Sequence, residues 1–193
     1  VLFRSKAVRA KDVADFEKMY RIINNDPQNE ILWVPAAAVK KIQKARYAEM
    51  VLHEMWCVAN LRIKSVEIQG DSAAVRFHHP ESRIQFEHPW PRPMVTKDGH
   101  NSAFYLTNAM ELLDEPGEWY HDIESRKIYY YPRKGEKISK AVVPGIETLV
   151  WVEGTIDRPV KHIRFDNIAF QYTTWMRPSL QGHVPLQAGI DRK

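Results

Sequence analysis

Hydrophobic and polar residues alternate through much of the middle of the chain with the two-residue period of β-strands. This pattern predicts strands at residues 30–34, 48–58, 61–69, 73–77 and 104–106. Gly70-Asp71 has the residue types of a tight turn and predicts a hairpin between two of these strands. Short strands at this spacing are typical of an antiparallel, sandwich-like β domain.

Two segments have the spacing of helices instead. Residues 12–24 place apolar side chains on one helical face, and Asp12 is a suitable N-cap, so a helix is predicted there. Residues 36–45 predict a second, shorter helix. The pattern as a whole is that of a mainly β protein with one or two short helices.

Residues 78–100 contain four prolines and four histidines and have little periodicity. They predict a long irregular loop, and such loops in compact domains are often functional. The histidines raise the question of a metal site, but none has the spacing of zinc ligands on a helix and no cysteine is near. We therefore expect ordinary loop histidines and no metal; they are His78, His79, His88 and His100.

The segment NAMELLDEPGEWYHDIESRKIYYYP, residues 108–132, has the most distinctive pattern in the chain. It predicts a short helical turn, a Pro-Gly turn at 114–117, and an aromatic hairpin with strands at 118–121 and 128–132. After a basic linker at 133–140, strand-like residues resume at 142–144 and 149–152.

A second distinctive segment lies at residues 160–172, VKHIRFDNIAFQY. Ile163 and Phe165 point to one side of a short strand, and Ile168 and Phe170 repeat this pattern after Asp166-Asn167. Asparagine tolerates the left-handed backbone conformation that such a bend requires. Two short strands joined by a two-residue bend are typical of a β-solenoid coil; a plain hairpin is the alternative.

Both segments, in this order, resemble bacterial right-handed parallel β-helix glycoside hydrolases, a group that includes xylosidase-like and fucosidase-like enzymes that trim plant polysaccharides. The resemblance implies a β-rich, sandwich-like inserted domain at residues 6–147, followed by the first coils of a right-handed parallel β-helix at residues 148–190. The pattern TTW…GHVPLQAG also matches the family near its substrate groove. It implies that Trp175, His183 and Gln187 bind substrate.

Glycoside hydrolysis usually needs two carboxyl groups beside the scissile bond. In the resembling family these come from later coils, so we expect no catalytic residue in this chain, and we expect the chain alone to be inactive. The carboxylates at Asp114, Glu115, Glu118 and Asp122 are expected to be turn residues. A polysaccharide lyase on the same solenoid and a non-catalytic carbohydrate-binding or structural module are the alternatives.

Composition limits the remaining classes of function. The formal charge is +4, but no basic stripe is present, so we expect no nucleic-acid partner. The family resemblance implies a saccharide partner. The sequence contains no run of 18 apolar residues, so no membrane span is predicted. Cys57 is the single cysteine and is expected to be a buried structural thiol. The sequence has no Gly-rich phosphate loop and no zinc-ligand spacing, so we expect no cofactor, and it has no Ser-His-Asp order that would indicate another kind of catalytic site. The family resemblance implies a secreted or periplasmic protein.

The two ends of the chain have unusual sequences. Residues 1–5, VLFRS, can be encoded by GTGCTCTTCCGATCT, and residues 191–193, DRK, by GATCGGAAG. The second string is the reverse complement of part of the first, and both resemble a sequencing adapter read on opposite strands. We therefore expect residues 1–5 and 191–193 to be scars that flank a clipped reading frame.

Overall fold

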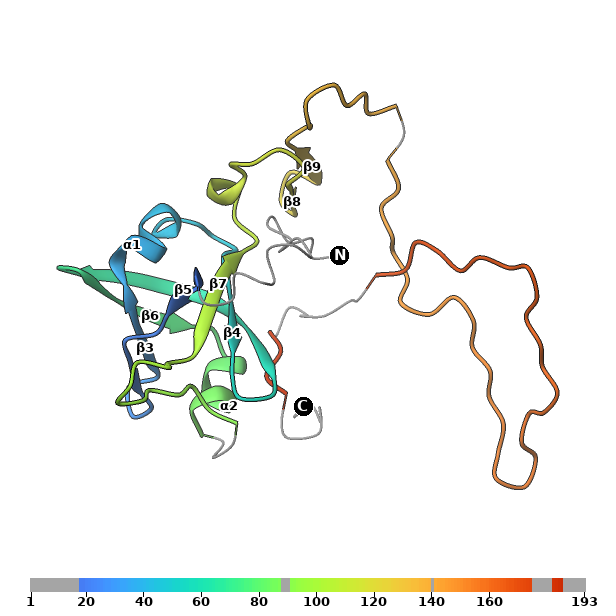
Figure 1. The fold of residues 1–193 in the computed structure, drawn as a ribbon, viewed down its shortest axis with the longest axis horizontal. Coiled ribbons are helices and arrows are strands. Elements are labelled where there is room, and N and C mark those ends of the chain that lie inside the picture. Colours follow the sequence, from blue (N-terminus) through green and yellow to red (C-terminus); the bar gives the residue numbers. More distant parts are fainter. Residues whose placement is uncertain (1–17, 88–90, 140, 175–181, 186–193) are drawn as a thin grey trace. The chain divides into compact units, whose positions relative to one another are not determined.

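The computed structural model describes residues 18–87, 91–139, 141–174 and 182–185. These residues divide into two compact units (Figure 1). Residues 137–174 form one unit, and residues 18–136 together with 182–185 form the other, which we call the sheet unit. The predicted scars, Trp175 and Gln187 lie outside the described residues.

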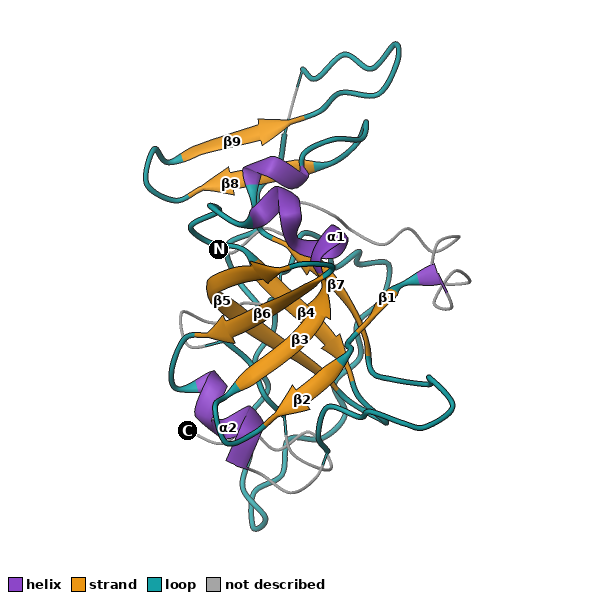
Figure 2. Cartoon of the chain, turned by 90° about the vertical axis from the view of Figure 1, so that its left-hand side faces the viewer, coloured by secondary structure: helices purple, strands orange, loops and turns teal. Residues whose placement is uncertain are grey.

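The sheet unit is built on seven strands in the order β1-β7-β4-β5-β6-β3-β2, and all pairs are antiparallel (Figure 2). The strands confirm the mainly β, antiparallel prediction; β3 to β7 correspond to predicted segments, whereas β1 and β2 were not predicted as strands. Their bounds are β1 Tyr20–Arg21, β2 Asn24–Asp26, β3 Ile31–Pro35, β4 Glu49–His53, β5 Val58–Gln69, β6 Ser72–Phe77 and β7 Ala103–Thr107.

The long strand β5 belongs to both halves of this sheet. Its first part pairs with β4, and its second part pairs with β6 through the predicted turn at Gly70-Asp71. The register shifts between Ile63 and Ser65, as at a β-bulge. An extra residue reverses the alternation of side chains, which explains why the apolar positions of β5 change from odd numbers (Leu61, Ile63) to even ones (Val66, Ile68).

Residues 20–26 join the two ends of the sheet. Tyr20 and Arg21 pair with β7, and Asn24 to Asp26 pair with β3. Between them, Ile22 is buried and its N–H donates to the carbonyl of Ser102. The helix predicted at 12–24 is therefore wrong from Tyr20 onward, because pairing to β7 and β3 outweighs a local helical preference.

The helical segments lie at opposite ends of the sheet (Figure 2). At one end, α1 (Ala36–Val39) continues into the 3-10 helix η2 (Lys40–Ile42), which confirms the short second helix. At the other end lies α2 (Glu81–Glu87), within the stretch predicted to be irregular. That prediction was wrong for these seven residues. None of the helices in the described ranges is long and apolar enough to cross a membrane.

The core lies between the sheet halves and consists of aliphatic and aromatic side chains. Its largest fully buried members come from six different elements or connections, so the core depends on the whole sheet closing. They include Ile22, Leu32, Ile42, Met50, Leu52, Leu61 and Phe104.

The distinctive segment of residues 108–132 folds as predicted. The 3-10 helix η3 (Met110–Leu112) precedes the turn, and a separate two-stranded sheet follows, made of β8 (Trp119–Asp122) and β9 (Lys127–Tyr130). Gly117 has φ +96°. This confirms the positive φ that was predicted at the second central position of the Pro-Gly turn, where glycine is favoured. Ion pairs from Lys41 to Asp114 and from Arg46 to Glu124, each 2.7 Å, hold this hairpin against η2 and the segment that follows it.

The other unit has no strand or helix in the residues described there, so the strands predicted at 142–144, 149–152 and 163–170 are absent from them. Ile163, Phe165, Ile168 and Phe170 are 49–59% exposed, although Phe165 and Phe170 contact each other edge to face at 5.5 Å. A strand needs a neighbour to satisfy its backbone groups, and one solenoid coil cannot bury its own apolar face. The predicted left-handed bend is confirmed, since Asn167 has φ +55°.

Candidate functional site

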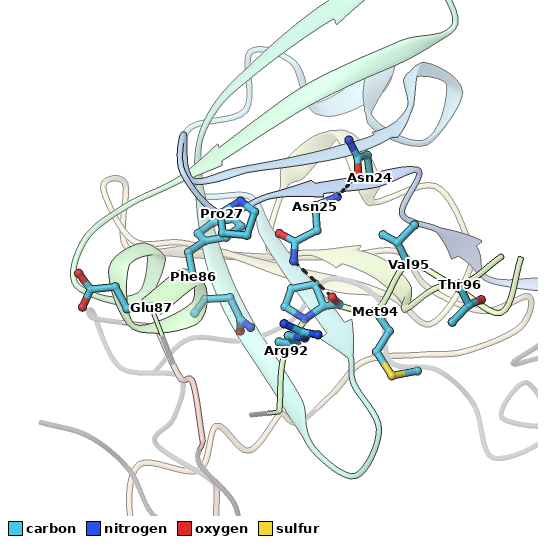
Figure 3. A pocket seen from close by; sticks show the side chains of 11 residues that line it. Asn24, Asn25, Pro27, Phe86, Glu87, Arg92, Met94, Val95 and Thr96 are labelled. Atoms are coloured by element: carbon cyan, nitrogen blue, oxygen red, sulfur yellow. Dashed lines mark hydrogen bonds between the residues drawn. The ribbon is translucent and has the colours of Figure 1, made fainter. Parts of the chain in front are cut away.

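The sheet unit contains a cavity of about 610 Å³, which we call the amide pocket (Figure 3). It lies where strand β2, the C-terminal part of α2 and the loop after it meet. Pocket volumes of roughly 300–1,000 Å³ are typical of small-molecule sites. The lining residues are Asn24, Asn25, Pro27, Gln85, Phe86, Glu87, Arg92, Pro93, Met94, Val95 and Thr96.

Hydrogen bonds to the backbone fix the loop that forms one wall of the amide pocket. The side chain of Asn101 accepts from the N–H of Thr96 at 2.8 Å and donates to the carbonyl of Ile22 at 2.8 Å. The N–H of Met94 donates to the hydroxyl of Ser102, whose own N–H donates to the carbonyl of Met94. This wall is therefore held in place before any ligand binds.

Two amide side chains present oxygen atoms that have no hydrogen-bond donor within the described structure. Asn25 donates from Nδ2 to the carbonyl of Pro93 at 3.3 Å, and its Oδ1 is left without a partner. Gln85 is fully buried and donates from Nε2 to Glu54 at 2.7 Å, and its Oε1 likewise has no hydrogen-bond partner among the described residues. Buried polar atoms are normally paired, so both acceptors indicate a place for an external donor.

Behind Gln85 lie the buried carboxylate of Glu54 and the half-buried thiol of Cys57. Glu54 accepts hydrogen bonds from Gln85 and, at 3.1 Å, from the thiol of Cys57. Burial raises the pKa of Glu54, and burial with the adjacent carboxylate raises the pKa of Cys57 to about 12. A thiol held in its protonated form is a poor nucleophile. Cys57 was predicted to be buried and is half-buried instead, and its role as a structural thiol stays a prediction.

A second cavity, of about 300 Å³, lies between the β8–β9 hairpin and the segments at residues 44–47 and 109–111. Three of its polar side chains engage one another: the hydroxyl of Tyr47 donates to Glu124 at 2.8 Å, and Arg46 pairs with the same carboxylate. The hydrogen bond to Glu124 raises the pKa of Tyr47. Tyr120 and Tyr129 stack in the wall with ring centroids 6.5 Å apart. These contacts attach the hairpin to the rest of the unit.

The structure places one of the three residues that were predicted to bind substrate. The backbone N–H and carbonyl of His183 both bond to Asn60, at 2.9 and 2.7 Å, so residues 182–185 lie against β5. Val184 is buried in the core. The role of the His183 side chain in sugar binding stays a prediction, as do the roles of Trp175 and Gln187, which lie outside the described residues.

Of the four carboxylates of the distinctive segment, Glu118 and Asp122 act as turn residues, as expected, and Asp114 pairs with Lys41. Glu118 accepts from the N–H groups of Asp114 and Glu115, both at 3.0 Å, and closes the Pro-Gly turn. Asp122 accepts from the hydroxyl of Ser125 at 2.7 Å and from the N–H groups of Ser125 and Glu124, and these bonds hold its pKa below the ordinary value. The sequence did not predict the buried carboxylates Glu49, Glu54 and Glu81, because burial depends on tertiary packing.

The histidines of the 78–100 stretch do not gather in the described structure. His78, His79 and His100 are exposed, and His88 is not described. In the described ranges, no three His, Cys, Asp or Glu side chains are close enough together to hold a metal ion. The stretch matters in another way: eight of the eleven residues that line the amide pocket come from it.

An unexpected ion pair connects β5 to the first residue of α2. Arg62 donates to both carboxylate oxygens of Glu81, at 2.6 and 2.9 Å, and also to the carbonyl of His79. Glu81 is 1% exposed. This pair fixes α2, and with it one wall of the amide pocket, against the sheet.

Comparisons with known proteins agree with this architecture. The family model described as "GH141 insertion domain" matches residues 2–133. A solved structure named "Glycoside hydrolase" is 66% identical, with a TM-score of 0.85; the match covers 98% of this chain and 32% of that one. This chain therefore spans about a third of that protein. The search of curated proteins found no match.

Proposed function

This chain belongs to the GH141 insertion-domain family, and we propose that it is part of a longer glycoside hydrolase that acts on plant-type polysaccharide or oligosaccharide. The main support is the 66% identity, over nearly the whole chain, to a protein named glycoside hydrolase. Since that protein is about three times as long, the proposal assigns the catalytic carboxylates to residues outside this chain. The turn roles of Glu118 and Asp122 are consistent with that assignment.

We further propose that residues 148–190 begin a right-handed parallel β-helix. In support, the N–H of Thr174 donates to the carbonyl of Ile146 at 3.1 Å, which joins positions 28 residues apart. Solenoid repeats are roughly 20–45 residues long. Left-handed residues also recur every five positions, at His162, Asn167 and Tyr172.

These left-handed residues separate two equivalent segments, Ile163-Arg164-Phe165 and Ile168-Ala169-Phe170. The proposal explains their exposure, because a first coil has its next neighbour in the residues that follow. Hydroxyl-radical labelling tests it: Ile163, Phe165, Ile168 and Phe170 should be strongly protected in the longer protein and labelled in this chain. Equal labelling in both proteins would contradict the β-helix proposal.

The enzymatic proposal is tested by expressing this chain and the longer protein side by side. We expect aryl-glycosides and plant polysaccharides to be hydrolysed by the longer protein, and no turnover by this chain alone. Unsaturated products, detected by ultraviolet absorbance, would favour the lyase alternative. Saccharide binding without turnover by the longer protein would favour a non-catalytic module.

The proposed substrate contacts need a separate test in the longer protein. Trp175→Ala removes a stacking face, and we expect a higher KM. His183→Ala leaves the two backbone bonds to Asn60 available, so a loss of substrate affinity without a loss of stability would support a role for the imidazole. Gln187→Ala tests the third residue in the same way. A secreted or periplasmic location also remains part of the proposal, and fractionation of producing cells tests it.

A further inference from the structure

We propose that the amide pocket binds a sugar unit that carries a carboxylate, such as a uronic acid. The choice of a saccharide rests on the proposed function, whereas the choice of an acidic one rests on the lining of the pocket. The pocket combines two amide acceptors, one guanidinium group and a partly apolar wall. Each part matches one chemical feature of a uronic acid.

The two amide acceptors match sugar hydroxyls. The amide groups of Asn25 and Gln85 cannot turn without losing the bonds from their nitrogen atoms to Pro93 and Glu54. Their oxygen atoms are therefore fixed as acceptors that need a donor. A sugar ring brings several O–H donors into one small volume, whereas a simple inorganic anion at neutral pH brings few.

The charge of the pocket lining selects for an acidic ligand. Glu87 and Arg92 are the charged lining residues. Arg83 neutralises Glu87 through a 2.6 Å ion pair, whereas within the described residues no carboxylate pairs with Arg92. Among the described residues, the guanidinium of Arg92 is therefore uncompensated at the pocket. A guanidinium binds a carboxylate through two parallel hydrogen bonds.

The remaining walls suit the C–H face of a sugar ring. Pro27, Phe86 and Met94 supply apolar surface, while the polar and charged groups come from other parts of the lining (Figure 3). The backbone bonds of Met94 and Thr96 hold the loop in place, so binding costs little ordering of the protein. A volume of about 610 Å³ is also large enough for a small saccharide.

The test uses pairs of ligands that differ only in charge. Trigalacturonic acid and a glucuronate-substituted xylo-oligosaccharide are each compared with their methyl esters by calorimetry on the 193-residue chain. We expect at least one acid to bind, and to bind at least tenfold more tightly than its ester. Absence of binding by both acids, or equal binding of acid and ester, would overturn the proposal. Inorganic phosphate is added as a competitor, and full displacement at an equal concentration would indicate a simple anion site and would also overturn it.

Variants then locate the binding site. Arg92→Gln should weaken binding of the acid by tenfold or more, and Arg92→Lys should restore part of it. Lys97→Gln removes the same charge from the same loop but not from the pocket lining, and it should change affinity less than twofold. Asn25→Ala should weaken the acid and the ester alike. Equal effects of Arg92→Gln and Lys97→Gln would contradict a site in the amide pocket.

These outcomes are independent of the enzymatic proposal. If the longer protein hydrolyses glycosides while neither acid binds this chain, the pocket proposal fails and the enzymatic one stands. If an acid binds this chain while the longer protein has no activity, the opposite holds.

Discussion

Gln85 donates a hydrogen bond from Nε2 to the buried carboxylate of Glu54, with 2.7 Å between the nitrogen and Oε1. This bond connects the amide pocket to the interior of the sheet unit, because Gln85 lines the pocket and Glu54 lies behind it. It also determines which end of the Gln85 amide remains for a ligand. Changes at Glu54 should therefore affect both stability and the pocket.

Glu54→Gln should alter how stability depends on pH. Burial raises the pKa of Glu54 above 4.5, so below that pH the folded and unfolded chains both hold the proton. As the pH rises through the folded pKa, the unfolded chain has already lost its proton, and the folded state becomes relatively less stable. The variant should therefore be at least as stable as the wild type at pH 7, with a gain that grows upward from about pH 4.5. Urea unfolding at a series of pH values measures this.

Glu67→Gln is the matched control for that prediction. Glu67 also accepts a hydrogen bond from a glutamine, Gln69 at 3.1 Å, but it is exposed on β5. Because Glu67 is exposed, its substitution should change the free energy of unfolding by less than about 0.5 kcal/mol. A similar change in both variants would show that burial of Glu54 is not the cause.

The thiol of Cys57 should react slowly with alkylating reagents. A pKa of about 12, raised by burial and by Glu54, leaves very little thiolate at pH 8. We expect alkylation by iodoacetamide at least a hundredfold slower than that of a small free thiol. Glu54→Gln removes the neighbouring negative charge and should accelerate the reaction. Reaction of the wild-type chain at the rate of a free thiol would show that Cys57 and Glu54 are open to solvent.

Breaking the pair between Arg62 and Glu81 should destabilise the sheet unit. Arg62→Met leaves the carboxylate of Glu81 buried without its partner, and losses of about 3 kcal/mol are typical of such a change. Replacing both residues by Met should recover much of this loss. Arg83→Gln breaks an exposed pair to Glu87 in the same helix and should cost less than about 1 kcal/mol. Equal losses for Arg62→Met and Arg83→Gln in urea unfolding would argue against a buried pair.

Gly182→Ala should weaken the attachment of residues 182–185 to β5. Gly182 has φ +68°, and a Cβ atom there would lie 2.7 Å from Cγ of Glu81 and 2.9 Å from the carbonyl oxygen of Asn60. Gly70 has a similar φ of +61° but open space around it, so Gly70→Ala carries only the backbone cost of about 1 kcal/mol. The difference between the two variants in urea unfolding isolates the steric clash. No difference would show that the segment can move away from β5.

Local pattern predicted most of the strands because the relevant information lies within each segment. Alternation identified β3 to β7, and turn residues identified the β5–β6 and β8–β9 hairpins. The helix predicted at 12–24 failed from Tyr20 onward because the apolar spacing of that stretch fits two structures. Pairing of Tyr20 with Phe104, which is far away in the sequence, selects the strand there, and Asn24 pairs with Trp33 across a short hairpin.

The amide pocket could be predicted only in part. The irregular stretch of residues 78–100 was recognised as a place where function often lies, and it supplies most of the lining. No spacing in the sequence connects Asn25 to Gln85 or Arg92, since 60 or more residues separate them. The bond that orients each amide also comes from a distant segment.

The sequence by itself determined the mainly β class, the turns, and the left-handed bend at Asn167, because each depends on the preferences of a few neighbouring residues. Tertiary structure decided which strand-like segments become strands. Those of the sheet unit find partners, whereas Ile163 to Phe170 have none among the described residues and stay exposed. The physical reason is that a strand is completed by hydrogen bonds and burial supplied by another segment, and a binding pocket by side chains from several.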